Sequence, residues 1–268
     1  MLKDSTFEPN RILQVDTLRV EIYQSAEAVA LAASAQAARI LRAAVEERQR
    51  AIAVFATGRS QKQCLRHLTS RTDIDWSKIT GFHLDEYLGI AAEHPASFRQ
   101  YLKMHLTSQV AMQAFHSIEG DGLLPIAICE QYEKKLRSHP PDLCFLGIGD
   151  NGHLAFNDPA VANFNDPRWV KLVRLDEKNR QQQLNSTDLE TIDAVPNYAF
   201  TLTLSAIGAV KHRLCLAFGK EKAAVVQRLL TGPISPDCPA AILRKLSQTT
   251  LLLDQAAASN YVSNLSID

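Results

Sequence analysis

The stretch "AIAVFATGRSQKQCLRHLTS", residues 51–70, contains the unit that decides the fold. Residues 51–56 form a short, fully apolar run, which predicts a strand buried on both faces. The next residues, "TGRS", form a turn with a glycine and two hydroxyl side chains, and residues 60–70 have the composition of a helix. A buried strand, a tight turn and a helix together indicate a parallel α/β sheet.

The same unit recurs along the chain. Short, mostly apolar runs predict strands over residues 19–24, 51–56, 78–84, 142–148, 169–175, 198–204, 212–218 and 249–254. Helices are predicted over residues 25–50, 60–70, 95–106, 127–138 and 220–230, with a short helix at the end of the chain. Ser25 is the expected N-cap of the first helix, and Pro95 is expected near the first turn of the third. We therefore expect one α/β domain over residues 1–268, with a single doubly wound, mostly parallel, Rossmann-like sheet and helices on both faces.

Composition limits the classes of partner. The chain has 268 residues, 46% of them hydrophobic, and its 29 basic and 29 acidic side chains cancel. A net charge of zero favours neither nucleic acid nor a membrane surface, so any anion site must be local. The start lacks an apolar signal-peptide core, and no apolar run is expected to approach membrane-spanning length. The cysteines are scattered and odd in number, which indicates free thiols and a cytoplasmic location: Cys64, Cys129, Cys144, Cys215 and Cys238.

Polar residues follow the predicted strands, where ligands bind in open α/β sheets. Thr57, Gly58 and Ser60 can form an anion cradle at the start of a helix, although a plain capped turn fits equally well. Asp85 and Glu86 follow the next strand. They indicate either a carboxylate directed into the crevice for proton transfer, or solvated acids that cap the next element.

The stretch "LGIGDNGHLAFNDP", residues 146–159, surrounds one histidine with polar side chains. Gly147 and Gly149 allow the backbone to turn tightly and to approach a ligand. His153 is either structural or a proton shuttle oriented by its neighbours Asp150, Asn151 and Asp158. Zinc is disfavoured because no cysteine or second histidine lies at ligand spacing.

Lys222 is predicted in the first turn of a helix, in the segment "FGKEKA". The helix dipole disfavours a cation there unless an anion is bound nearby. This position therefore supports a phosphate-binding surface at the strand ends.

Four segments taken together resemble one family. "ATGRS", "FHLDEYLGI", "GIGDNGHLAFNDP" and "FGKEKA" occur in the order seen in the glucosamine-6-phosphate deaminase/isomerase family, which is related to 6-phosphogluconolactonase. The match spans roughly residues 51–230, and "LDEYLG" and "AFNDP" resemble the deaminase branch.

The resemblance implies roles for individual residues. Asp85 matches the base that moves a proton between C2 and C1 of the open-chain sugar, and His153 matches the histidine that assists ring opening. Asn151 and Asp158 are the implied catalytic partners of that histidine. The implied substrate-binding residues are Thr57, Gly58, Arg59, Ser60, Glu86, Gly149, Gly152, Arg180 and Lys222. Neither a cofactor nor a metal is expected.

The chain departs from the family pattern at several positions. Asn151 replaces the more usual aspartate, Asp158 replaces glutamate, and Arg59 and Gln61 replace a small residue and a proline. We therefore expect His153 to depend on Asp158, or on Asp150 if the backbone turns that residue inward. Asn151→Asp is expected to be tolerated because it restores the usual pattern.

The resulting functional expectation is isomerising deamination of glucosamine 6-phosphate to fructose 6-phosphate and ammonia. This places the chain in amino-sugar and carbohydrate metabolism, within N-acetylglucosamine catabolism, as an isomerase with hydrolase character. The alternatives are a 6-phosphogluconolactonase, a deaminase or isomerase of another amino-sugar phosphate, and a non-catalytic sugar-phosphate sensor. The expected partner is a small-molecule sugar phosphate, without nucleic acid or membrane, and homo-oligomer formation stays open.

Overall fold

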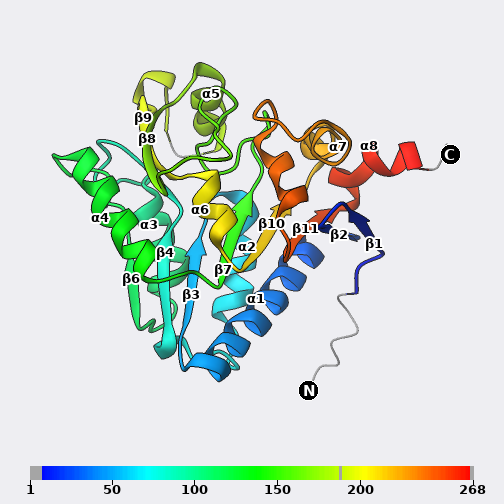
Figure 1. Cartoon of the computed structure of the whole chain (residues 1–268), viewed down its shortest axis with the longest axis horizontal. Helices are drawn as coiled ribbons and strands as arrows, with labels where there is room; N and C mark the ends of the chain where they lie inside the picture. Colours follow the sequence, from blue (N-terminus) through cyan, green and yellow to red (C-terminus); the bar gives the residue numbers. More distant parts are fainter. Residues whose placement is uncertain (1–7, 187–188, 266–268) are drawn as a thin grey trace.

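The computed structural model describes residues 8–186 and 189–265, which are built around an eight-stranded sheet (Figure 1). Its strand order is β1-β2-β11-β10-β7-β3-β4-β6, and every neighbouring pair is parallel except β1 with β2. The strands are β1 (Arg11–Val15), β2 (Leu18–Tyr23), β3 (Ala51–Phe55), β4 (Ile79–His83), β6 (Ala114–His116), β7 (Leu143–Gly147), β10 (His212–Ala217) and β11 (Thr249–Asp254). The predicted mostly parallel α/β fold is confirmed.

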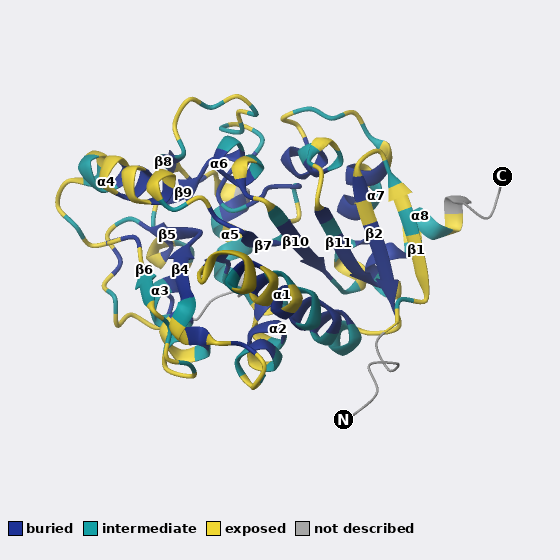
Figure 2. Cartoon of the chain, turned by 60° about the horizontal axis from the view of Figure 1, so that its bottom comes forward, coloured by how far each residue is buried: buried dark blue, intermediate teal, exposed yellow. Residues whose placement is uncertain are grey.

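Helices cover both faces of this sheet. The α-helices are α1 (Ala26–Arg48), α2 (Arg59–Thr69), α3 (Phe98–Leu102), α4 (Pro125–Ser138), α5 (Glu177–Ser186), α6 (Leu204–Ala209), α7 (Ala223–Thr231) and α8 (Gln255–Leu265). Short 3-10 turns span Trp76–Lys78, Ile192–Ala194, Lys220–Lys222 and Pro239–Lys245. Helices α1 and α2 pack together across one face, seen in front in Figure 2. The opposite face carries α6, because Arg213 of β10 donates to carbonyls at the end of that helix.

Helix α1 begins and ends where its sequence predicts. The Ser25 hydroxyl accepts a hydrogen bond from the Ala28 amide at 3.3 Å, and Gln49 adopts a left-handed conformation after the last turn. By length and composition alone this helix could cross a membrane, so the expectation that no apolar run approaches that length was wrong. Half of its most apolar window is buried inside the protein, and its buried residues, which are mostly alanine, lie against the sheet as in a core helix.

A second, three-stranded antiparallel sheet lies beside the main one. It consists of β5 (Asp85–Tyr87), β9 (Tyr198–Leu202) and β8 (Val170–Arg174), in that order. The sequence predicts two of these strands but assigns them to the main sheet, because strand periodicity does not specify the partner strand. Tyr87, Phe98 and Phe156 pack under this sheet with ring centroids 4.8–5.9 Å apart. The chain therefore leaves the main sheet at β4 and enters the second sheet directly at Asp85.

Several boundaries differ from the prediction. Strands β1 and β6 were missed, since β1 is a mostly exposed edge strand and β6 has only three residues. The helix expected over residues 95–106 begins later, at Phe98, and continues as a π-helical turn over Lys103–Thr107. Pro95 lies before it, and the Glu86 carboxylate accepts hydrogen bonds from the amides of Phe98 and Arg99. A side chain distant in sequence thus takes the capping role and sets the helix start.

Candidate active site

A cavity of about 260 Å³ lies at the carboxyl ends of β3, β4, β7 and β10. It is lined by the residues after each of these strands, as predicted from the parallel sheet. The lining includes nine residues singled out from the sequence: Thr57, Gly58, Arg59, Ser60, Asp85, Gly147, Gly149, His153 and Lys222.

One end of the cavity is built to receive an anion. Gly58 has a φ of +99°, a conformation that favours glycine, and it places the first turn of α2 against the cavity. The Tyr101 hydroxyl fixes this loop by donating to the Gly58 carbonyl at 2.8 Å. The positive end of α2 and its first amides therefore face the site.

Buried Gln61 orients the hydroxyl of Ser60. Its Nε2 group donates to Ser60 Oγ at 3.0 Å and to the Leu146 carbonyl at 3.1 Å. Because Ser60 Oγ accepts this bond, its own proton is free to be donated elsewhere. Gln61 thus makes Ser60 available as a hydrogen-bond donor to an anion in the cavity.

Lys222 supplies a cation to the same region. Its Nζ lies 2.6 Å from Asp150 Oδ1, and the side chains are 19% and 61% exposed, respectively. Such a solvent-accessible ion pair is weak, so an arriving anion can compete for the ammonium group. Asp150 therefore holds Lys222, and the structure does not place it beside His153.

Asp85 occupies the point where the chain passes from one sheet to the other. Its side chain lines the cavity, and its backbone pairs with Thr201 of β9. Burial, followed by the charge of Glu86, raises the pKa of Asp85 to about 8. A carboxylate with a proton affinity this close to neutrality suits general base catalysis.

His153 is held by two side chains at one ring nitrogen. Its Nδ1 lies 2.8 Å from Asn151 Oδ1 and 3.0 Å from Asp158 Oδ1. Since both oxygens accept hydrogen bonds, Nδ1 carries a proton, and Nε2 is the nitrogen left for a substrate in the cavity. The expected dependence on Asp158 is thus consistent with the geometry.

The Asp158 carboxylate is fully engaged in this relay. Asn151 donates to Oδ1 at 2.7 Å, and Asn179 of α5 donates to Oδ2 at 2.6 Å. Burial raises the pKa of Asp158. The hydrogen bond and charge of His153 and the hydrogen bonds from the two amides together lower the pKa by more than burial raises it, so the net shift is downward. Asp158 is therefore ionised at neutral pH and can orient the imidazole.

The interaction of Asn151 with Asp158 reverses one expectation from the sequence. Asn151→Asp would place a second carboxylate where an N–H group now donates to Asp158. Two adjacent carboxylates cannot both ionise without repulsion, so we expect a loss of stability that grows as the pH rises from 5 to 8. Thermal unfolding of the variant and wild type at both pH values checks this. A Tm difference that does not change with pH would contradict it.

Gly149 makes room for the imidazole. A Cβ atom at this position would lie 2.1–2.3 Å from three ring atoms of His153. The family resemblance suggests a substrate contact at Gly149, and the glycine does line the cavity, but its lack of a side chain is needed by the histidine.

Gly149→Ala should lower kcat about 10²-fold, because a displacement of a catalytic group by about 1 Å has an effect of this size. Gly147→Ala is the matched control, since a Cβ there would lie 3.2 Å from Ser60 Oγ, at the anion-receiving end of the cavity, and not against the imidazole. Steady-state kinetics should show a kcat effect for the first variant and mainly a KM effect for the second. An unchanged kcat for Gly149→Ala would show that the imidazole can move without loss.

Glu86 does not reach the cavity. Its carboxylate is buried and accepts hydrogen bonds from the Tyr87 amide at 2.9 Å and the Ser97 hydroxyl at 2.8 Å, besides the two amides at the start of α3. The expectation of substrate binding is therefore corrected: this acid holds α3 against β5.

Arg180 and Gly152 are also placed outside the cavity lining. The Arg180 guanidinium donates to the carbonyls of Ile192 at 2.5 Å and Val195 at 3.0 Å. These hydrogen bonds hold the guanidinium away from the anion-receiving end of the cavity. Gly152 has a φ of +92°, and a Cβ atom there would lie 2.8 Å from Cys238 Sγ. Its requirement for glycine comes from the backbone and from packing rather than from a substrate.

Helix α5 contributes residues that the sequence did not identify. Gln182 and Gln183 line the cavity, and Asn179 binds Asp158. Gln182 Oε1 accepts from the Asp150 amide at 3.0 Å, and Gln183 Oε1 accepts from the Tyr87 hydroxyl at 2.8 Å. Positions 179, 182 and 183 share one helical face, a spacing that could have identified them.

Comparison with known proteins agrees with this geometry. Residues 24–252 match the family of glucosamine-6-phosphate isomerases/6-phosphogluconolactonases. The chain is 33% identical over 205 residues to a glucosamine-6-phosphate deaminase of Listeria welshimeri, an alignment covering 76% of this chain and 85% of that protein. It is 35% identical over 192 residues to a glucosamine-6-phosphate deaminase of Oenococcus oeni, covering 71% and 78%, respectively.

Solved structures give the same relationship. A monomeric glucosamine-6-phosphate deaminase superposes with a TM-score of 0.82 at 30% identity, over 90% of this chain and 99% of that one. A 6-phosphogluconolactonase of Trypanosoma brucei superposes with a TM-score of 0.73 at 18% identity, over 93% and 99%, which shows a shared fold. With most of its length matched in sequence and in structure, the chain belongs to the glucosamine-6-phosphate isomerase/6-phosphogluconolactonase family.

Proposed function

We propose that this chain converts glucosamine 6-phosphate and water into fructose 6-phosphate and ammonia. The observation that carries the proposal is that one cavity combines an anion cradle with a carboxyl group, Asp85, and an oriented imidazole, His153. Relatives over most of the chain are named glucosamine-6-phosphate deaminases, which supports this substrate.

The first step is opening of the pyranose ring. His153 Nε2 accepts the proton of the C1 hydroxyl and returns a proton to the ring oxygen as the C1–O5 bond breaks. Asp158 stabilises the imidazolium formed between these transfers, and Asn151 holds the ring plane.

The second step moves a proton along the open chain. Asp85 removes the proton from C2 and delivers it to C1, while one proton of the amino group passes to O1, so that the C1 aldehyde becomes an alcohol and the amine becomes an imine at C2. Water then adds to C2, and ammonia leaves to give the ketone. Water is consumed only here, so the hydrolytic character is confined to the last step, and every step is proton transfer, addition or elimination.

Lys222 is proposed to bind the phosphate group together with Thr57, Gly58, Arg59 and Ser60. Lys222→Ala should raise KM about 30- to 150-fold with little change in kcat, since a hydrogen bond to a charged group contributes roughly 2–3 kcal/mol. Lys220→Ala is the matched control, because this neighbouring lysine is exposed and lies outside the cavity lining. Equal KM values for Lys222→Ala and wild type would remove the lysine from the site.

An ammonia-release assay across hexosamine 6-phosphates tests the proposed function. We expect turnover of glucosamine 6-phosphate, much slower turnover of the free amino sugar, and no hydrolysis of 6-phosphogluconolactone above background. Lactone hydrolysis without ammonia release would assign the chain to the lactonase branch. Saturable binding of glucosamine 6-phosphate without product would indicate a sensor.

We also propose that the protein works in a reducing compartment such as the cytoplasm. All five cysteines are buried and free, which suits thiols that are kept reduced. Their oxidation state in protein purified without reductant, measured by thiol titration after unfolding, checks this point.

A further inference from the structure

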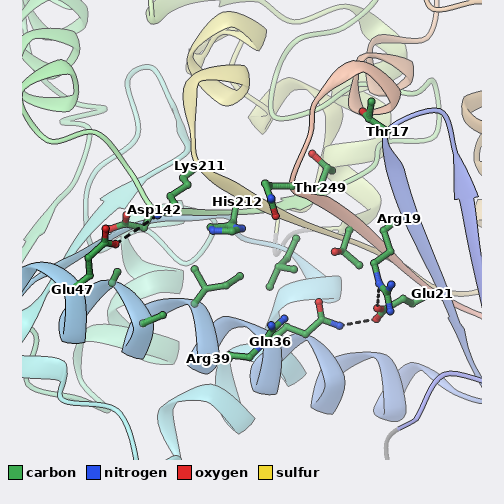
Figure 3. A pocket seen from close by; sticks show the side chains of 16 residues that line it. Thr17, Arg19, Glu21, Gln36, Arg39, Glu47, Asp142, Lys211, His212 and Thr249 are labelled. Carbon is green, nitrogen blue, oxygen red and sulfur yellow. Dashed lines mark hydrogen bonds and ion pairs between the residues drawn. The ribbon is translucent and has the colours of Figure 1, made fainter.

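A second cavity, of about 610 Å³, lies at the amino ends of the strands of the main sheet, opposite to the candidate active site at their carboxyl ends (Figure 3). One wall is helix α1, and the other is formed by the first residues of β2, β10 and β11. Because these strands are parallel, this edge carries their amino ends.

The floor of this cavity is apolar. Ile40, Ala43 and Ala44 of α1 face Leu214 of β10 across it. Two consecutive alanines leave space between the helix and the sheet that larger side chains would fill. The cavity can therefore receive the apolar or ring-shaped part of a small molecule.

The buried acid at one end, Glu21, is already satisfied. It accepts hydrogen bonds from Arg19 Nε, the Tyr23 hydroxyl and Gln36 Nε2, each at 2.6 Å. Its charge is thus balanced by Arg19 within the protein, and it does not call for a cationic ligand.

The acids at the other end are also paired. Asp142 forms an ion pair with Arg48 and accepts from the Ile52 amide at 2.9 Å. Glu47 lies 3.8 Å from Arg48 and 3.7 Å from Lys211. Both carboxylates therefore have basic partners before any ligand binds.

Arg39 and His212 remain as donors on facing walls of the cavity, one on α1 and the other on β10 (Figure 3). Among residues 8–186 and 189–265, Arg39 has no ion pair within 4.0 Å. Burial lowers the pKa of His212, and so do the positive charges of Lys211, Arg213 and Arg39, whereas the charge of Asp142 raises it.

We propose that this cavity binds a phosphate monoester of sugar or nucleotide size. The phosphate lies between Arg39 and His212, with Lys211 nearby, and the organic part lies on the alanine-lined floor. A guanidinium group suits a phosphate because its N–H groups match the oxygens in pairs. The site is separate from the proposed active site, which lies at the carboxyl ends of the same strands.

NMR of the histidine imidazoles in the full chain tests this proposal, with the His212 signal assigned through His212→Gln. The probes are adenosine 5′-monophosphate, glucose 6-phosphate and inorganic phosphate, with adenosine as the control that lacks a phosphate. At least one of the two esters should shift the His212 signal saturably and raise the pKa of His212, whereas adenosine should not. The two esters distinguish a nucleotide from a sugar as the organic part. No saturable shift with any phosphate probe would overturn the proposal.

Variants separate this cavity from the one at the other edge. Arg39→Gln removes the guanidinium, and Ala43→Leu fills the space from an exposed position, so neither change disturbs the core. Arg39→Gln should raise the ester concentration that gives half of the His212 shift at least about tenfold, the loss expected for a charged contact. Ala43→Leu should raise the same concentration because its side chain occupies the floor on which the organic part lies. Lys222→Ala should leave that shift unchanged. A shift that survives in both α1 variants but disappears in Lys222→Ala would place the phosphate at the candidate active site and contradict the inference.

Discussion

Asp85→Asn is expected to lower kcat about 10²–10⁴-fold while KM for glucosamine 6-phosphate changes little. The amide keeps the size of the side chain at the junction of β4 and β5 but cannot take the C2 proton. Exchange of that proton with solvent is a second measurement on the same variant. Exchange at the native rate in Asp85→Asn would assign the base to another group.

The same carboxyl group predicts the pH dependence of the wild type. Its pKa of about 8 means that the base form is the minority near neutral pH. We therefore expect kcat/KM to rise with pH from 6 and to level off above about 8. A profile that is flat between pH 6 and 8 would mean that Asp85 is not the group whose ionisation limits the reaction.

Stability should change in the opposite direction to activity. The pKa of Asp85 is higher in the folded chain than in an unfolded one, so ionisation destabilises the fold as pH rises from about 4 to about 8. Asp85→Asn removes this penalty and should raise Tm, more at pH 8.5 than at pH 5. An activity loss accompanied by a stability gain at high pH distinguishes a lost base from a damaged fold.

Asp158→Asn is expected to have an effect of similar size, about 10²–10⁴-fold in kcat with the closed pyranose, because a positioned proton shuttle contributes this much. The carboxylate accepts from His153, Asn151 and Asn179, and an asparagine has only one oxygen to replace two. The imidazole would lose its ionic partner and its fixed orientation. The deficit should be much smaller for steps that start from the open-chain sugar, since His153 acts at ring opening.

Asp150→Asn is the matched control for this prediction. It removes a carboxylate from the same loop, but one that pairs with Lys222. We expect a change in KM and a normal ratio of closed-ring to open-chain rates. Equal losses on both substrates for Asp158→Asn would make Asp158 a structural residue.

The residues brought together at the carboxyl edge could be predicted from the sequence because the strands are short, apolar and parallel. Once 51–56, 142–148 and 212–218 are recognised as neighbouring strands, the residues after them must meet. For this reason the sequence alone predicts that the anion loop, the His153 loop and Lys222 lie close together.

The contacts made by single side chains could not be predicted in the same way. Asp85 and Glu86 are adjacent acids, yet β5 alternates, so one lines the cavity and the other caps α3. The family resemblance implies a substrate contact for Arg180, whereas it is the neighbouring Asn179 that contacts Asp158, and Arg180 binds backbone carbonyls. Which face of a short segment points inward depends on a second sheet and a helix that local periodicity does not specify.

The reaction of glucosamine 6-phosphate in D₂O, followed by NMR together with an ammonia assay, tests whether proton transfer by Asp85 and ammonia release belong to one reaction. We expect fructose 6-phosphate and ammonia in equal amounts, with solvent deuterium entering at C1 because Asp85 exchanges its proton while it holds it. Ammonia release without fructose 6-phosphate would contradict the proposed reaction. Formation of fructose 6-phosphate by Asp85→Asn at the native rate would contradict the role of Asp85.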